Sequence, residues 1–239
     1  MATIAAPEVS AFQKERAFFF HMALAVLVTV LAGFGSFFAI GGSTIHAPWW
    51  VHLHGLSMVT WVGLYVTQNW LVYRGNITAH RTLGPLAAAW SVWIFGLGVV
   101  VTVWDVQTGR VPPFFTPNYF LVMDWLNMVA FAALAWSAIA LRGRSDWHKR
   151  LMLGAMIQLI AVAWGRMTFP YIFDQRANWL VMAILLGYFG VGMLFDRRTR
   201  GAVHPAYFWG AGALVGYISL SYVLADLPPI LALTKSLSG

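Results

Sequence analysis

The sequence predicts an all-α polytopic membrane protein with seven transmembrane helices. Of its 239 residues, 60% are hydrophobic and 10% are charged, whereas a soluble domain carries about a quarter charged residues. The hydrophobic residues form seven stretches, and each is long enough to cross a hydrocarbon core of about 30 Å. The charged residues collect between these stretches. The whole chain, 1–239, is therefore predicted to be a single integral-membrane domain.

The predicted helices follow one another with short connections. They cover residues 17–40, 48–73, 83–106, 119–141, 147–167, 177–195 and 206–227. Prolines support the boundaries, because proline ends helices more often than it continues them: Pro48 precedes the second stretch and Pro170 follows the fifth. The first apolar run has about 25 residues, beyond the roughly 7–15 residues of a signal-peptide core, so we expect it to be a retained helix.

The basic residues predict how the helices are oriented. Eleven of the fifteen Lys and Arg residues fall on one side of the membrane if every stretch crosses it. By the positive-inside rule this side is the cytoplasm, so the N-terminus is cytoplasmic and the C-terminus periplasmic in a bacterial inner membrane. The net charge of +7 is therefore explained by basic residues that orient the helices in the membrane, and no nucleic-acid partner is expected. The eleven are Lys14, Arg16, Arg74, Arg81, Arg142, Arg144, Lys149, Arg150, Arg197, Arg198 and Arg200.

Polar residues near the outer ends of three predicted helices form one candidate site. His52 and His54 are two residues apart, which on a helix separates them by about 200°, so only one can face the interior. His54 begins the more polar stripe and is assigned to the interior, with His52 as an interfacial or accessory group. Asp124 and Arg166 lie at a similar depth. The stripe from His54 continues through Met58, Trp61, Tyr65 and Gln68.

This outer cluster has three interpretations. In the structural one, Asp124 and Arg166 form an ion pair that tethers two helices, because a buried carboxylate is costly when unpaired. In the functional one, His54 ligates a metal or haem iron, with His52 and Asp124 as further candidate metal ligands, and Arg166 binds a haem propionate or another anion. The third is a proton or small-solute pathway through His54, Asp124 and Gln68.

The second candidate site lies at the cytoplasmic end, where four histidines occur at or near helix starts. A histidine beside basic residues is usually interfacial. Two imidazoles from separate helices, however, are the usual axial ligands of a low-spin b-type haem, and nearby Arg or Lys suit its propionates. His80 and His148 are the pair that begins two predicted helices in similar basic contexts; the other two are His21 and His204.

The motifs across residues 48–168 resemble an uncharacterised bacterial family of predicted membrane proteins. They are His52-x-His54-Gly55, His80-Arg81-x-x-Gly84, Arg144-x-x-x-His148-Lys149-Arg150-x-Met152 and the final Arg166. Their layout is similar to the transmembrane dihaem cytochrome b family that reduces ferric iron with ascorbate. That resemblance implies two haems held by histidine pairs at opposite faces. His80 and His148 match the inner pair, whereas His54 has no histidine partner on the fourth helix, where Met123 and Asp124 stand.

We therefore expect a haem b-binding or metal-binding membrane protein that acts in electron transfer or redox sensing, with a quinol or another membrane redox protein as its partner. A single transition-metal ion, or no cofactor, is the alternative. The chain has no cysteine, which excludes iron–sulfur clusters and thiolate metal sites. The competing function is a non-enzymatic membrane subunit or sensor whose polar clusters only fix helix packing.

Overall fold

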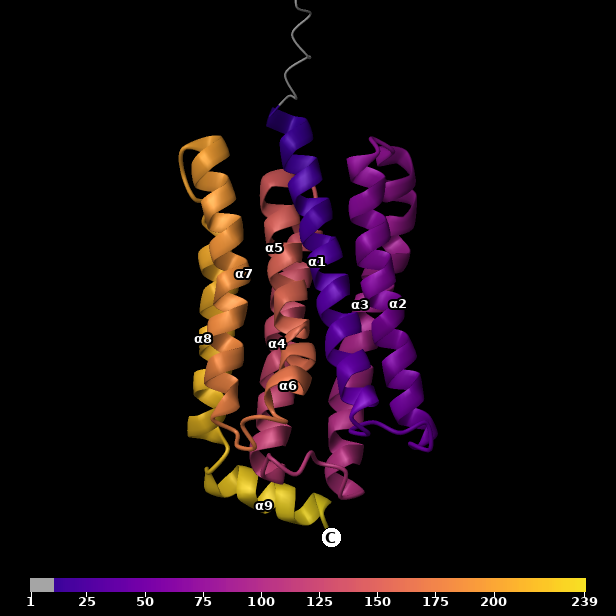
Figure 1. Ribbon diagram of the computed structural model, residues 1–239, viewed down its shortest axis with the longest axis vertical. Helices are drawn as coiled ribbons and strands as arrows, with labels where there is room; N and C mark the ends of the chain where they lie inside the picture. Colours follow the sequence, from indigo (N-terminus) through magenta and orange to yellow (C-terminus); the bar gives the residue numbers. More distant parts are fainter. Residues whose placement is uncertain (1–10) are drawn as a thin grey trace, which may run out of the picture.

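The computed structural model describes residues 11–239, and this part of the chain is all-α, with no strand (Figure 1). The predicted fold class is confirmed at this level. Six segments are long and apolar enough to cross a membrane: α1, α3, α4, α5 with α6, α7 and α8. The helices are α1 (Ala11–Ala39), α2 (Trp49–Tyr73), α3 (Ile77–Gln107), α4 (Pro117–Ala140), α5 (Ser145–Leu159), α6 (Ala161–Thr168), α7 (Ala177–Arg200), α8 (Ala206–Leu224) and α9 (Pro228–Leu237).

The long helices run side by side as a bundle (Figure 1). Contacts between helices close a ring from α1 through α2, α3, α4 and α5–α6 back to α1. Outside this ring, α8 packs against α4 and α5, and α7 packs against α5, α6 and α8. Small residues allow the closest approaches: a Cβ added to Gly33 on α1 would collide with the carbonyl oxygen of Ala163 on α6. Large side chains fill the interior of the ring, including Trp61, Tyr65 and Phe131.

The outer surface of the bundle is apolar, as contact with a lipid bilayer requires. Many large hydrophobic side chains are exposed along the helices, and a surface of this kind is unfavourable in water. They include Val28, Leu31, Leu56, Val59, Val92, Val129, Leu180, Val191, Leu194, Phe208 and Val223.

The fifth predicted helix, 147–167, corresponds to one span-length segment, Ser145–Thr168, but an interruption that was not predicted divides this segment into two helices. α5 ends at Leu159 and α6 begins at Ala161, with Ile160 between them. The break occurs where the Asn127 side-chain amide donates to the backbone carbonyl of Gln158 at 3.4 Å. A polar side chain that enters the hydrogen-bond ladder in this way kinks a helix. Because the cause lies on α4, the local sequence does not reveal it.

The last helix, α9, was not predicted. It lies across the end of the bundle opposite the start of α1 (Figure 1). Leu233 and Leu237 pack against a small core formed by Val106, Phe120 and Leu121 at the ends of α3 and α4. With only ten residues, α9 is too short to cross a bilayer; its place across the helix ends suits the membrane interface.

Candidate functional site

The structure brings His80 and His148 together at the end of the bundle that holds the start of α1. His80 lies in the first turns of α3 and His148 in the first turn of α5. Their ring centres are 6.3 Å apart and the ring planes meet at 76°. Because α3 and α5 are not neighbours in the ring of helices, the two histidines face each other across its interior.

Both imidazoles are held by a second contact. The Nδ1 atom of His148 lies 2.7 Å from the carbonyl oxygen of Ala138 on α4, so this nitrogen carries the proton and donates it. The Nδ1 atom of His80 accepts a hydrogen bond from the side-chain amide of Gln68 on α2, when this amide is oriented so that both its nitrogen and its oxygen have hydrogen-bond partners. Four helices thus determine how this pair of rings is placed.

His54, Asp124 and Arg166 converge at the other end of the ring from α2, α4 and α6. Arg166 lies close enough to interact electrostatically with both His54 and Asp124. Its guanidinium group stacks over Phe34 at 4.1 Å, and it donates to the backbone carbonyl of Val162 at 3.2 Å. Within the described residues, no partner satisfies the Nδ1 atom of His54 or the Nε atom of Arg166.

The ion pair between Asp124 and Arg166, which the structural interpretation required, does not form. Among residues 11–239 no Arg166 nitrogen lies within 4.0 Å of a carboxylate. Asp124 instead accepts a long hydrogen bond, 3.5 Å, from Thr102 on α3. Asn127, three residues along α4, faces α5, because α4 packs between these two neighbours.

His52 points away from His54, and this agrees with the prediction from helical spacing that only one of the two faces the interior. Its ring is exposed and lies 3.1 Å from the backbone carbonyl of Ile45 in the α1–α2 connection. The part of the chain that the structure describes contains no group of three or more His, Asp or Glu side chains placed to hold a metal ion. A two-histidine arrangement such as His80 with His148 is a different kind of site.

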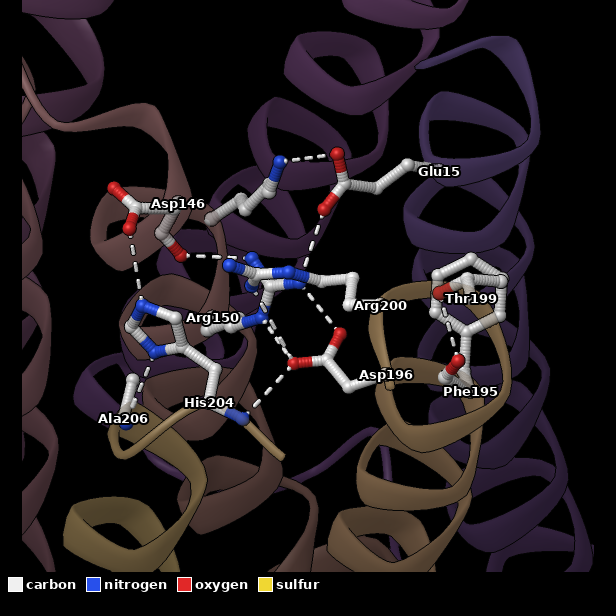
Figure 2. A network of polar contacts seen from close by, with 10 residues as sticks. Glu15, Asp146, Arg150, Phe195, Asp196, Thr199, Arg200, His204 and Ala206 are labelled. Carbon is white, nitrogen blue, oxygen red and sulfur yellow. Dashed lines mark hydrogen bonds and ion pairs between the residues drawn. The ribbon is translucent and has the colours of Figure 1, made fainter. Parts of the chain in front are cut away.

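The most extensive polar network was missed in the sequence (Figure 2). Arg150 was counted among the basic residues of the cytoplasmic side without a partner being predicted, but it and Asp196 are both 0% exposed. The Arg150 guanidinium binds both carboxylate oxygens of Asp196, with Nε to Oδ2 at 2.9 Å. It also donates to Glu15 at 3.0 Å and to the backbone carbonyl of Asp146 at 3.0 Å. The network therefore joins α1, α5 and α7.

His204, in the connection between α7 and α8, belongs to the same network. Its backbone N–H donates to Asp196 at 3.1 Å, and its Nε2 atom lies 3.1 Å from Asp146 (Figure 2). Burial lowers the pKa of His204, and the bond to Asp146 acts in the opposite direction. The sequence signal was an aspartate within a basic cluster: Asp196 is followed by three arginines, and Asp146 is one helical turn before Arg150.

Comparison with protein-family models, curated proteins and solved structures finds no match to this chain. A function is therefore inferred from the arrangement of its own residues.

Proposed function

We propose that the protein binds haem b between His80 and His148 and acts as an electron carrier or redox sensor in the bacterial inner membrane. The separation of the two rings is the observation that carries this proposal. Two nitrogens that bind one metal from opposite sides are about 4 Å apart, and adding about 1 Å from each nitrogen to its ring centre places the centres about 6 Å apart. The separation of 6.3 Å in this protein fits that arrangement.

The hydrogen bond from His148 also supports the proposal. Because Nδ1 donates to the carbonyl of Ala138, the lone pair of this imidazole is on Nε2. A metal-binding histidine commonly donates its other ring nitrogen to a backbone carbonyl or carboxylate, which fixes the ring and the tautomer. His148 is held in that way before any ligand is present.

Two unsatisfied donors at the same end suit the propionates of a haem. The hydroxyl of Tyr65, one turn from Gln68 on α2, and the Nε atom of Arg16 are buried without a partner in the described part of the chain. Arg16 lies beside Gly75 in the turn that leads into α3. Buried donors of this kind are costly unless a ligand satisfies them. Bound haem would supply one-electron chemistry, with a quinol or another membrane redox protein as its partner.

The test is the absorption spectrum of the protein purified in mild detergent from cells supplied with a haem precursor. We expect about one haem per chain and a reduced-minus-oxidised spectrum with the sharp bands of a six-coordinate low-spin b-type haem. Metal analysis of the same sample separates haem from a single transition-metal ion. A folded, colourless preparation with no stoichiometric metal would refute the proposal and leave the membrane subunit or sensor as the function.

We further propose that α2 also crosses the membrane, which makes seven crossings with a cytoplasmic N-terminus. α2 has 25 residues, enough to span a bilayer, and it runs beside α1 and α3 (Figure 1). The start of α1 and the α2–α3, α4–α5 and α7–α8 connections share one end of the bundle (Figure 1). These connections and the helix turns next to them hold the eleven basic residues that the positive-inside rule places in the cytoplasm.

Single cysteines test this topology without background labelling, because the chain has none of its own. Ser43→Cys, in the α1–α2 connection, should react with a membrane-impermeant maleimide in intact spheroplasts. Arg74→Cys, between α2 and α3, should react only after the membrane is permeabilised. Both positions are exposed, so equal labelling of the two in intact spheroplasts would show that α2 does not cross.

A further inference from the structure

Gln68 contacts one turn of α3 with both ends of its amide. In the amide orientation that satisfies both backbone groups, the nitrogen donates to the backbone carbonyl of His80 at 3.2 Å and to the Nδ1 atom of the same residue, and the oxygen accepts from the backbone N–H of Gly84 at 3.2 Å. A side chain held at both ends has one defined orientation. In this orientation the Nδ1 atom of His80 is an acceptor.

The two facing imidazoles therefore carry their protons on different nitrogens. A neutral imidazole has one N–H and one lone pair. Because Nδ1 of His80 accepts from Gln68, its proton is on Nε2. Because Nδ1 of His148 donates to Ala138, its proton is on Nδ1. Without a cofactor, His148 offers a lone pair at Nε2 and His80 offers a donor.

We infer that Gln68 is a positioning residue: it sets the tautomer of His80 and thereby the affinity and reduction potential of a metal held between His80 and His148. This inference rests on the proposed function. For His80 to bind iron through Nε2, its proton must move to Nδ1, and Gln68 must then present its amide oxygen there. A rotation of the amide by about 180° does this, since its two ends are nearly equal in size, and it gives up the two bonds to the backbone of His80 and Gly84.

A glutamine suits this task because an amide has a donor and an acceptor at the same reach. A carboxylate at position 68 can only accept, so it would hold the proton on Nδ1 permanently and make the imidazole a more basic ligand. An aliphatic side chain would do neither. Substitutions at this position therefore separate the effect of the tautomer from the presence of the ring.

The experiment compares Gln68→Glu with Asn69→Asp. Both change an amide to an acid on the same turn of α2, but the Asn69 amide donates to the carbonyl of Tyr65 at 2.9 Å and not to a histidine. In haem-loaded protein, Gln68→Glu should favour the oxidised iron at least about tenfold, which lowers the midpoint potential by about 59 mV for one electron. Asn69→Asp should produce less than a third of that shift. Gln68→Leu should weaken haem binding about 10–100-fold.

A second measurement does not require haem. In cofactor-free protein with 15N-labelled histidine, long-range 15N–1H spectra should show the proton of His80 on Nε2 in the natural chain and in Asn69→Asp, and on Nδ1 in Gln68→Glu. An unchanged His80 tautomer in Gln68→Glu, or equal potential shifts for the two acidic variants, would overturn the inference. If the tautomer moves as expected while the natural chain binds no haem or metal, the proposed function fails and the control of His80 by Gln68 stands.

Discussion

Replacing Arg150 by Met is expected to destabilise the protein by about 3–5 kcal/mol, because removal of one partner leaves the other charges of a buried ion pair uncompensated. Arg150 and Asp196 are fully buried, so water cannot replace the lost hydrogen bonds at Asp196. Glu15 would lose one of its two partners on α5 and keep the other, Lys149, at 2.7 Å. The free energy of unfolding, measured by titration from mild detergent into a denaturing one, provides the comparison with the natural chain.

Arg200→Met is the matched control for this prediction. Arg200 also approaches Asp196, but at 3.7 Å and with a side chain that is 40% exposed, so its removal should cost less than about 1 kcal/mol. Arg150→Lys keeps the charge but loses the two-pronged contact, and it should fall between the two. Replacing both charges, Arg150→Met with Asp196→Leu, should recover part of the loss. Equal losses for Arg150→Met and Arg200→Met would contradict a stabilising role for the buried network.

Removing either inner histidine should abolish low-spin haem binding. His80→Ala and His148→Ala each delete one axial ligand, and we expect haem affinity to fall by more than about 100-fold. Loss of a residue that only hydrogen-bonds to a ligand typically costs about 10–100-fold, so the loss of the ligand itself should be larger. The measurement is the haem content and the reduced-minus-oxidised spectrum of the purified variants. Their unfolding in detergent should stay close to that of the natural chain, which separates loss of a ligand from loss of the fold.

Two other histidines serve as controls. His21, on α1, is exposed, and His21→Ala should retain the haem spectrum. His54→Ala should also retain the inner haem, since about 14 residues of helix, or roughly 21 Å, separate His54 from Gln68. A haem signal that survives in His80→Ala and His148→Ala but disappears in His54→Ala would move the cofactor to the outer cluster and contradict the proposed site.

Spacing along single helices predicted part of the arrangement of polar residues, whereas His80 and His148 were selected from their basic contexts at helix starts. The period of 3.6 residues separated His52 from His54 and placed Gln68 on the stripe of His54. The same reasoning could not say which helix each stripe faces. Asp124 and Asn127 share a side of α4, yet Asp124 contacts α3 and Asn127 contacts α5. Similarly, the bonds from Gln68 to His80 and from His148 to Ala138 join different helices.

By itself, the sequence determined that the chain is all-α, that it carries membrane-spanning lengths of apolar helix, and about where most of those helices lie. These features depend on local composition and on the fixed thickness of a bilayer, which a single stretch of chain must match. Only the tertiary structure decided which polar groups meet. It buried Arg150 against Asp196, broke the fifth helix beside Asn127, and placed His80 opposite His148. The reason is that helix order around a bundle and the rotation of each helix depend on packing between residues far apart in the chain.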